Sequence, residues 1–139
     1  MKINEEELKK KLSAEEYAVL REGATEPAFT GQYVDTHEDG MFHCKACGQA
    51  LFSSEAKFES GTGWPSFTDP VNAEHVELIS DDSHGIHRTE VRCINCGSHL
   101  GHVFDEPTPP SGLRRPGGPK YWTGKRFCIN SCALDFKEK

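Results

Sequence analysis

The chain has 139 residues, which is enough for one domain with one modest hydrophobic core. Its formal net charge of −6 argues against nonspecific nucleic-acid binding as its main task. No apolar run reaches the roughly 18 residues of a membrane span, and the acidic N-terminus lacks the apolar stretch of a signal peptide. We therefore expect a cytoplasmic protein with reduced thiols and with no membrane or nucleic-acid partner.

Residues 1–24 predict a helical arm. Asn4 can cap a first helix that carries acidic residues in its first turn and basic residues in its last. Ser13 and Glu16 have the spacing of a capping box for a second helix, and Gly23 is a plausible end for it. We interpret this segment as an amphipathic arm that packs on the rest of the chain.

Residues 30–136 predict a β body. Gly, Pro, Asp and Asn recur at short intervals, and the apolar stretches shorten to the length of strands. The expected strands are residues 74–79, 87–93, 100–104 and 126–130, with a turn at 81–85 and a long irregular loop at 107–119. Many short strands without intervening helices indicate antiparallel sheets or a small barrel. We expect a mainly β protein with a single domain over residues 1–139.

Two short cysteine loops organise this body. Each has two cysteines three positions apart followed by a glycine, which can adopt the positive φ of a tight turn. Four thiolates are the number that Zn²⁺ takes in a closed structural site, and the alternatives are two disulfides or four buried thiols. We favour zinc and predict as its ligands Cys44, Cys47, Cys93 and Cys96.

Cys128 is the candidate for thiol chemistry. Residues 107–134 contain no Asp or Glu but five Lys or Arg, including Arg126, and nearby cations lower the pKa of a thiol. The alternative is that Cys128 is a buried filler on a strand, because free cysteine is among the most buried residue types. Charge alone leaves both interpretations open.

Possible partners of Cys128 lie elsewhere in the chain. His99 and His102 follow the second cysteine loop directly, and a histidine can act as a general acid near neutral pH. They could also bind a metal, although four cysteines already supply a full set of ligands. Trp64 lies in a Gly/Pro loop, where an exposed indole suits an apolar or cation-like ligand group. Packing in the core is the alternative for Trp64.

Together these segments resemble the B-type methionine sulfoxide reductases, in their zinc-containing form. The likeness covers roughly residues 12–136, and it is specific because its motifs occur in one order along the chain. They are Gly-Thr-Gly-Trp-Pro-Ser-Phe at 61–67, Arg-Thr-Glu-Val-Arg-Cys at 88–93, His-Leu-Gly-His-Val-Phe at 99–104 and Arg-Phe-Cys-Ile-Asn-Ser at 126–131.

The resemblance implies an enzyme that reduces the R epimer of methionine sulfoxide, mainly in proteins, on a fold of two antiparallel β-sheets. Oxidised proteins would be its substrates and thioredoxin or another thiol its reductant. Cys128 matches the nucleophile, which would become a sulfenic acid, and the four loop cysteines match the zinc ligands. Further residues match active-site or substrate-binding positions: Trp64, Phe67, His99, His102, Arg126 and Asn130.

The chain departs from this family's pattern at Thr62. Many members have a cysteine there, which attacks the sulfenic acid to form a disulfide. Cys132 is the remaining candidate for this resolving role, but a spacing of four residues suits a disulfide neither on a straight strand nor on a helical turn. If Cys132 is a packed small residue instead, an external thiol must reduce the sulfenic acid directly.

A non-enzymatic alternative is a zinc-stabilised binding module. The basic segment 114–126, with Tyr121 and Trp122 inside it, could serve as its binding surface. Cys128 and His102 would then be inert. Nothing in the sequence, such as a heptad repeat, indicates more than a monomer.

Overall fold

The computed structural model describes residues 5–31, 33, 39–58, 63–81, 88–105 and 124–138. The helices are α1 (Glu5–Lys11) and α2 (Ala14–Glu22), and the 3-10 turns are η1 (Ser54–Ala56), η2 (Ala73–His75) and η4 (Ser131–Ala133). The strands are β1 (Gly40–Cys44), β2 (Ala50–Ser53), β3 (Lys57–Phe58), β4 (Ser66–Phe67), β5 (Val76–Asp81), β6 (Arg88–Cys93), β7 (His99–Asp105), β8 (Lys125–Ile129) and β9 (Leu134–Glu138). In these residues no helix has both the length and the apolar character that crossing a membrane requires.

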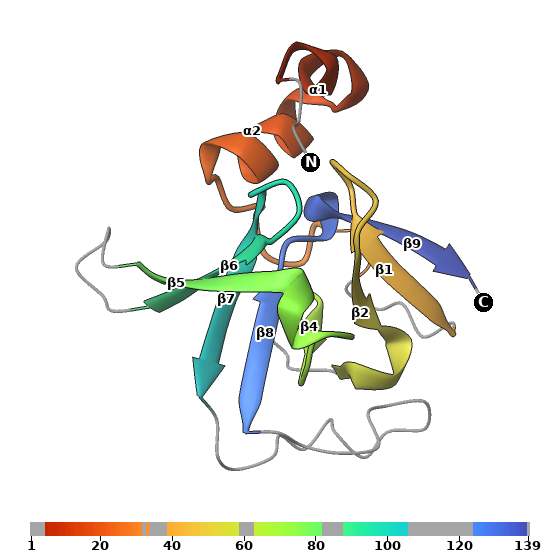
Figure 1. The fold of residues 1–139 in the computed structure, drawn as a ribbon, viewed down its shortest axis with the longest axis vertical. Helices are drawn as coiled ribbons and strands as arrows, with labels where there is room; N and C mark the ends of the chain where they lie inside the picture. Colours follow the sequence, from red (N-terminus) through yellow and green to blue (C-terminus); the bar gives the residue numbers. More distant parts are fainter. Residues whose placement is uncertain are drawn as a thin grey trace.

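The strands form two antiparallel sheets, as predicted (Figure 1). The smaller sheet has the order β2-β1-β9, and the larger has the order β3-β4-β8-β7-β6-β5. The C-terminal strand β9 pairs with β1 along its whole length, so the end of the chain completes the smaller sheet. The mainly β fold class is therefore confirmed.

A cluster of phenylalanine rings joins the two sheets. Phe42 and Phe52 come from the smaller sheet, and Phe67 and Phe127 come from the larger one. The rings of Phe52 and Phe67 are stacked with centroids 4.5 Å apart, and Phe42 meets Phe67 edge-on at 5.1 Å. Such aromatic pairs add about 0.5–1.5 kcal/mol beyond the burial of their area. The aromatic part of the hydrophobic core thus lies between the sheets, and the helices add Leu8, Val19 and Leu20 to the same buried cluster.

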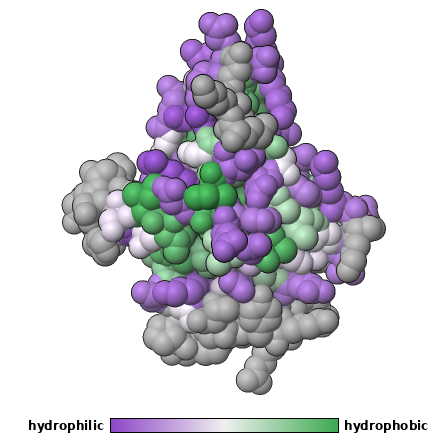
Figure 2. All heavy atoms as spheres, in the orientation of Figure 1, coloured by the Kyte–Doolittle hydropathy of each residue, from purple (hydrophilic) through white to green (hydrophobic). Residues whose placement is uncertain are grey.

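The helical arm lies at one end of the molecule, over the two cysteine loops (Figure 1). Ser13 and Glu16 form the predicted capping box at the start of α2, and Gly23 ends that helix with a φ of 76°. Lys11 Nζ donates to the backbone oxygen of Ala46 in the first cysteine loop at 3.3 Å. Figure 2 shows that this arm is largely hydrophilic on its outer face, whereas hydrophobic residues gather over the sheet below it. Asn4, the predicted cap of α1, lies outside the described residues.

The expected strands are present, with differences of one or two residues at their ends. Residues 74 and 75 belong to η2, because the side chain of Asn72 accepts a hydrogen bond from the backbone of Glu74 and starts a 3-10 turn. Asn130 lies just beyond β8, although its backbone N–H still donates to the oxygen of Leu100. Most of the turn at 81–85 and the loop at 107–119 lie outside the described residues.

We predict that Phe67→Ala lowers the free energy of unfolding by about 3–5 kcal/mol, because it opens a cavity in the ring cluster. Phe104→Ala is the matched control: Phe104 is half-buried on β7, and its truncation should cost about 1 kcal/mol. Urea unfolding of both variants measures the difference. Equal losses would contradict the placement of Phe67 in the core.

Candidate active site

A cavity of about 260 Å³ opens on the face of the larger sheet that points away from the aromatic core. It brings together residues from the segment after α2, from the loop before β4 and from strands β6, β7 and β8. Its lining residues are Thr25, Trp64, Arg88, Gly101, His102, Phe104, Arg126, Cys128 and Asn130. Five of the site residues predicted from the sequence therefore surround one cavity.

Strand register places Cys128 at the middle of this site. Cys128 on β8 is paired with Ser66 on β4 and with His102 on β7. Because directly paired residues point to the same face of a sheet, the thiol and the imidazole lie on one side. A Cβ on Gly101 would come within 2.1 Å of the backbone oxygen of Cys128, so only glycine lets β7 approach β8 this closely.

The charge around Cys128 is positive. Arg126 lies two residues before Cys128 on the same strand and therefore shares its face. Its guanidinium group lies over the ring of Phe104, 4.6 Å from the centroid. Arg88 also lines the cavity, and none of the lining residues in the described part of the chain is Asp or Glu. Such an electropositive setting favours the thiolate form of a cysteine.

Hydrogen bonds hold two other walls of the cavity. The indole Nε1 of Trp64 donates to the backbone oxygen of Glu26 at 3.0 Å. The side chain of Asn130 accepts from the backbone N–H of Glu26 and donates through Nδ2 to the oxygen of Leu100, each at 3.0 Å. With one accepted and one donated bond, the orientation of this amide is unambiguous.

His99 lies beside the cavity rather than in its lining. Its Nδ1 is 2.7 Å from the carboxylate of Glu90, and its ring meets that of His102 edge-on at 5.5 Å. Arg92 binds the same carboxylate oxygen at 2.9 Å. Burial tends to raise the pKa of Glu90, but the hydrogen bonds from Arg92 and His99 outweigh it and hold this pKa below its ordinary value of 4.5. Glu90 therefore fixes the orientation of the His99 ring.

The expectation that Phe67 contacts substrate is corrected by its position. Phe67 follows Ser66 on β4, so it points to the opposite face of the sheet, where it stacks on Phe52. Its side chain has no exposed surface. Phe67 therefore belongs to the core and does not line the cavity.

Cys132 faces a different cavity, of about 230 Å³. That cavity is lined by Ser13, Glu15, Glu16, Glu26, Thr30, Gly31, Ser131, Cys132 and Leu134. Burial, and then the charge and hydrogen bond of Glu26, raise the pKa of the Cys132 thiol well above its ordinary value. A thiol that stays protonated is a poor nucleophile.

The two cysteine loops come together as predicted. All four sulfur atoms lie within 4.8 Å of one another, in a cluster that could hold a metal ion: Cys44, Cys47, Cys93 and Cys96. None of them forms a disulfide. The glycines that end the loops, Gly48 and Gly97, have φ values of 85° and 74°, as the tight turns require. Hydrogen bonding among the four thiols raises the pKa of Cys44 and lowers that of Cys47.

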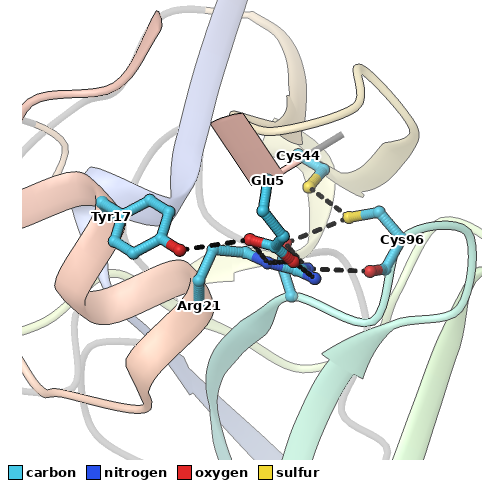
Figure 3. Close-up of polar contacts among 6 residues, drawn as sticks. Glu5, Tyr17, Arg21, Cys44 and Cys96 are labelled. Carbon is cyan, nitrogen blue, oxygen red and sulfur yellow. Dashed lines mark hydrogen bonds and ion pairs between the residues drawn. The ribbon is translucent and has the colours of Figure 1, made fainter. Parts of the chain in front are cut away.

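The helical arm is tied to the second cysteine loop through Arg21 (Figure 3). Its Nη1 donates to the backbone oxygen of Cys96 at 2.8 Å and to Ser98 Oγ at 3.1 Å. Glu5 forms an ion pair with the same guanidinium group, and Tyr17 donates to the Glu5 carboxylate at 3.2 Å. Both helices therefore support the position of this loop.

Sequence reasoning missed part of the cavity lining. Thr25, Arg88, Gly101 and Phe104 line the cavity but were not predicted as site residues. Period-2 alternation could have pointed to Phe104, which lies two residues after His102 on the same strand. Of the basic segment proposed as a binding surface, residues 114–123 lie outside the described part of the chain.

The fold combines two antiparallel sheets with a four-cysteine cluster and with a cavity that is lined by a further thiol. The SelR domain model matches residues 12–138 of the chain. Similar curated proteins named peptide methionine sulfoxide reductase MsrB come from Thioalkalivibrio sulfidiphilus and Synechococcus sp.. The first is 50% identical over 97% of this chain and 90% of its own length, and the second is 49% identical over 100% and 93%.

A protein of the same name from Burkholderia mallei is 48% identical over 96% of this chain and 85% of its own length. These similarities cover nearly the whole chain. The chain belongs to the SelR family, the family of the MsrB peptide methionine sulfoxide reductases.

We predict a pH-dependent difference in stability between the wild type and Glu90→Gln. Because the pKa of Glu90 is lowered in the folded protein, its ionised form stabilises the fold above the unfolded value of about 4.3. This contribution is lost as the pH falls through the folded value. Urea unfolding from pH 7 to pH 3 should show an advantage for the wild type that is constant at first and shrinks below about pH 4.3. An advantage that keeps growing below about pH 4.3 would contradict the assignment.

Proposed function

We propose that this chain reduces methionine-R-sulfoxide, mainly in oxidised proteins, through a sulfenic acid on Cys128. The observation that carries the proposal is that Cys128, His102 and Trp64 line the same cavity. A thiol, a proton donor and an aromatic surface are the three groups that the reaction needs. The preference for the R epimer comes from the resemblance to the B-type enzymes.

In the first step, the Cys128 thiolate attacks the sulfoxide sulfur while His102 donates a proton to the sulfoxide oxygen. The attack forms a bond between the two sulfur atoms. This bond then breaks as the protonated oxygen passes from the substrate sulfur to the Cys128 sulfur, so methionine leaves and Cys128 becomes a sulfenic acid. The sulfoxide is reduced by two electrons and the cysteine is oxidised by two. Glu90 supports this step indirectly, because it holds His99 against the ring of His102.

The remaining walls of the cavity suit the substrate. The Trp64 indole offers an apolar face to the methyl group and can stabilise positive charge that develops on sulfur. Arg126 and Arg88 favour the thiolate before the attack. Asn130 uses one Nδ2 hydrogen on Leu100 and has a second for a group in the cavity.

For recycling, we propose direct reduction of the sulfenic acid by an external thiol, either thioredoxin or a small molecule. Two thiols of the reductant form a disulfide, and the oxygen leaves as water. The raised pKa of Cys132 and its place in a separate cavity argue against this cysteine as the resolving thiol. Thr62 lies outside the described residues. Six free cysteines suit a reducing compartment such as the cytoplasm.

We propose that the four-cysteine cluster holds Zn²⁺. With Zn–S distances of about 2.3 Å, the corners of a tetrahedron lie about 3.8 Å apart. The Sγ atoms of Cys44 and Cys96 are 3.7 Å apart, and those of Cys47 and Cys93 are 3.6 Å apart. Four thiolates leave no open coordination position, which supports a structural role for the metal rather than a catalytic one.

We predict that Cys128→Ser lowers turnover at least about 10³-fold, because no other described group can replace the nucleophile. Cys132→Ser should keep turnover within about twofold of the wild type, because Cys132 faces another cavity. Turnover is measured on separated R and S sulfoxides with dithiothreitol. Wild-type protein oxidised by substrate without reductant should gain about 16 Da, whereas an internal disulfide would show a loss of about 2 Da. Normal turnover by Cys128→Ser would reject the proposed function.

We predict about one zinc ion per chain, with its removal lowering the free energy of unfolding by about 3 kcal/mol or more. Elemental analysis and urea unfolding before and after chelation measure both quantities. Cys96→Ser should lose the metal, whereas Cys132→Ser should retain it and serves as the control. Full stability after complete removal of the metal would contradict a structural role for it.

A further inference from the structure

Glu26 is a buried acidic residue for which the proposed chemistry has no use. It lies in the segment between α2 and β1, and only 3% of its surface is exposed. A buried carboxylate is costly unless several donors compensate it. Its surroundings therefore need a physical explanation.

The Glu26 carboxylate binds the turn that follows Cys128 in the chain. Oε2 accepts from the backbone N–H of Ser131 at 2.9 Å, and Oε1 accepts from that of Cys132 at 3.0 Å. These two N–H groups begin η4, where the chain changes direction after β8. Asn130, the residue before this turn, provides no side-chain cap for it. The Glu26 side chain caps the turn instead, although it lies more than 100 residues earlier in the sequence.

The backbone of the same residue contacts two walls of the active-site cavity. Its N–H donates to Asn130 Oδ1, and its carbonyl oxygen accepts from Trp64 Nε1, each at 3.0 Å. Three residues later, Phe29 N–H donates to the oxygen of Gly63 at 2.7 Å. Phe29 has a φ of 65°, a conformation that a bulky residue adopts only when its surroundings impose it. The segment therefore follows a path that is set by its contacts with the Trp64 loop.

We propose that Glu26 is a positioning residue that sets where Trp64 and Asn130 lie relative to Cys128. The bonds of its carboxylate to the η4 turn fix the residue, and its peptide groups then hold the indole and the amide. The inference rests on the proposed function in one respect, since it takes these two side chains as substrate contacts. A residue that only caps η4 would affect stability without affecting the place of the indole.

The test compares Glu26→Gln with Glu15→Gln. Glu15 is an exposed residue that lines the same acidic cavity, so its replacement removes the same charge without touching the turn. Glutamine at position 26 keeps one acceptor but turns an NH₂ group toward a backbone N–H. Both variants are made in a Trp122→Phe background, where Trp64 is the only indole of the chain.

We expect Glu26→Gln to shift the emission of Trp64 to longer wavelength and to lower kcat/KM about tenfold, mainly through KM. Glu15→Gln should match its parent in both measurements. If Glu26→Gln does not fold, the same two measurements are made on Glu26→Asp. This variant keeps the carboxylate but shortens the side chain by one methylene. Unchanged emission together with unchanged KM in the variant that folds would overturn the proposal. The emission is independent of turnover, so an inactive wild type would reject the proposed function and leave this test intact.

Discussion

Four sulfur atoms tie the two sheets together at one end of the molecule. Cys44 is the last residue of β1 in the smaller sheet, and Cys93 is the last residue of β6 in the larger one. The sulfur cluster therefore brings together the ends of one strand from each sheet, beside the hydrophobic core that lies between the sheets. A metal held by this cluster would stabilise a small domain, because the core of such a domain alone provides little net stability. The helical arm covers the same end of the molecule, with Arg21 bound to the second loop.

The larger sheet serves two purposes: one of its faces packs in the aromatic core, and the other carries the candidate active-site cavity. Along β8, Phe127 packs in the aromatic core, whereas Cys128, the next residue, faces the cavity. Along β7, His102 faces the cavity and Val103 is buried. Since successive side chains alternate between the faces, packing on one side fixes the positions of the Cys128 and His102 side chains on the other. If β8 shifted by one residue in register, the Cys128 thiol would be buried in the core and the Phe127 ring would be exposed in the cavity.

Local features of this fold could be predicted from residue patterns, whereas several contacts between distant segments could not. The capping box at Ser13 and the glycine-ended cysteine loops depend on residues a few positions apart, and all of them are present. The strands of the smaller sheet were not among the expected ones, because β1 pairs with β9 across most of the length of the chain. Phe67 was misplaced because a strand of two residues is too short to reveal which face each residue takes. Glu26 was missed because its partners lie up to 106 positions away.

The two cysteines near the C-terminus show how the fold places two thiols in opposite electrostatic surroundings. Cys128 and Cys132 are four residues apart, but the strand ends at Ile129 and the η4 turn directs the second thiol into another cavity. Arginine side chains line the first cavity, and glutamate side chains line the second. Cations favour a thiolate and carboxylates oppose it, so the same chemical group meets opposite fields on the two sides of the turn. Glu26 contributes to both sides, with its carboxylate toward Cys132 and its peptide groups toward the walls around Cys128. The difference between the thiols thus arises from the change of chain direction between them.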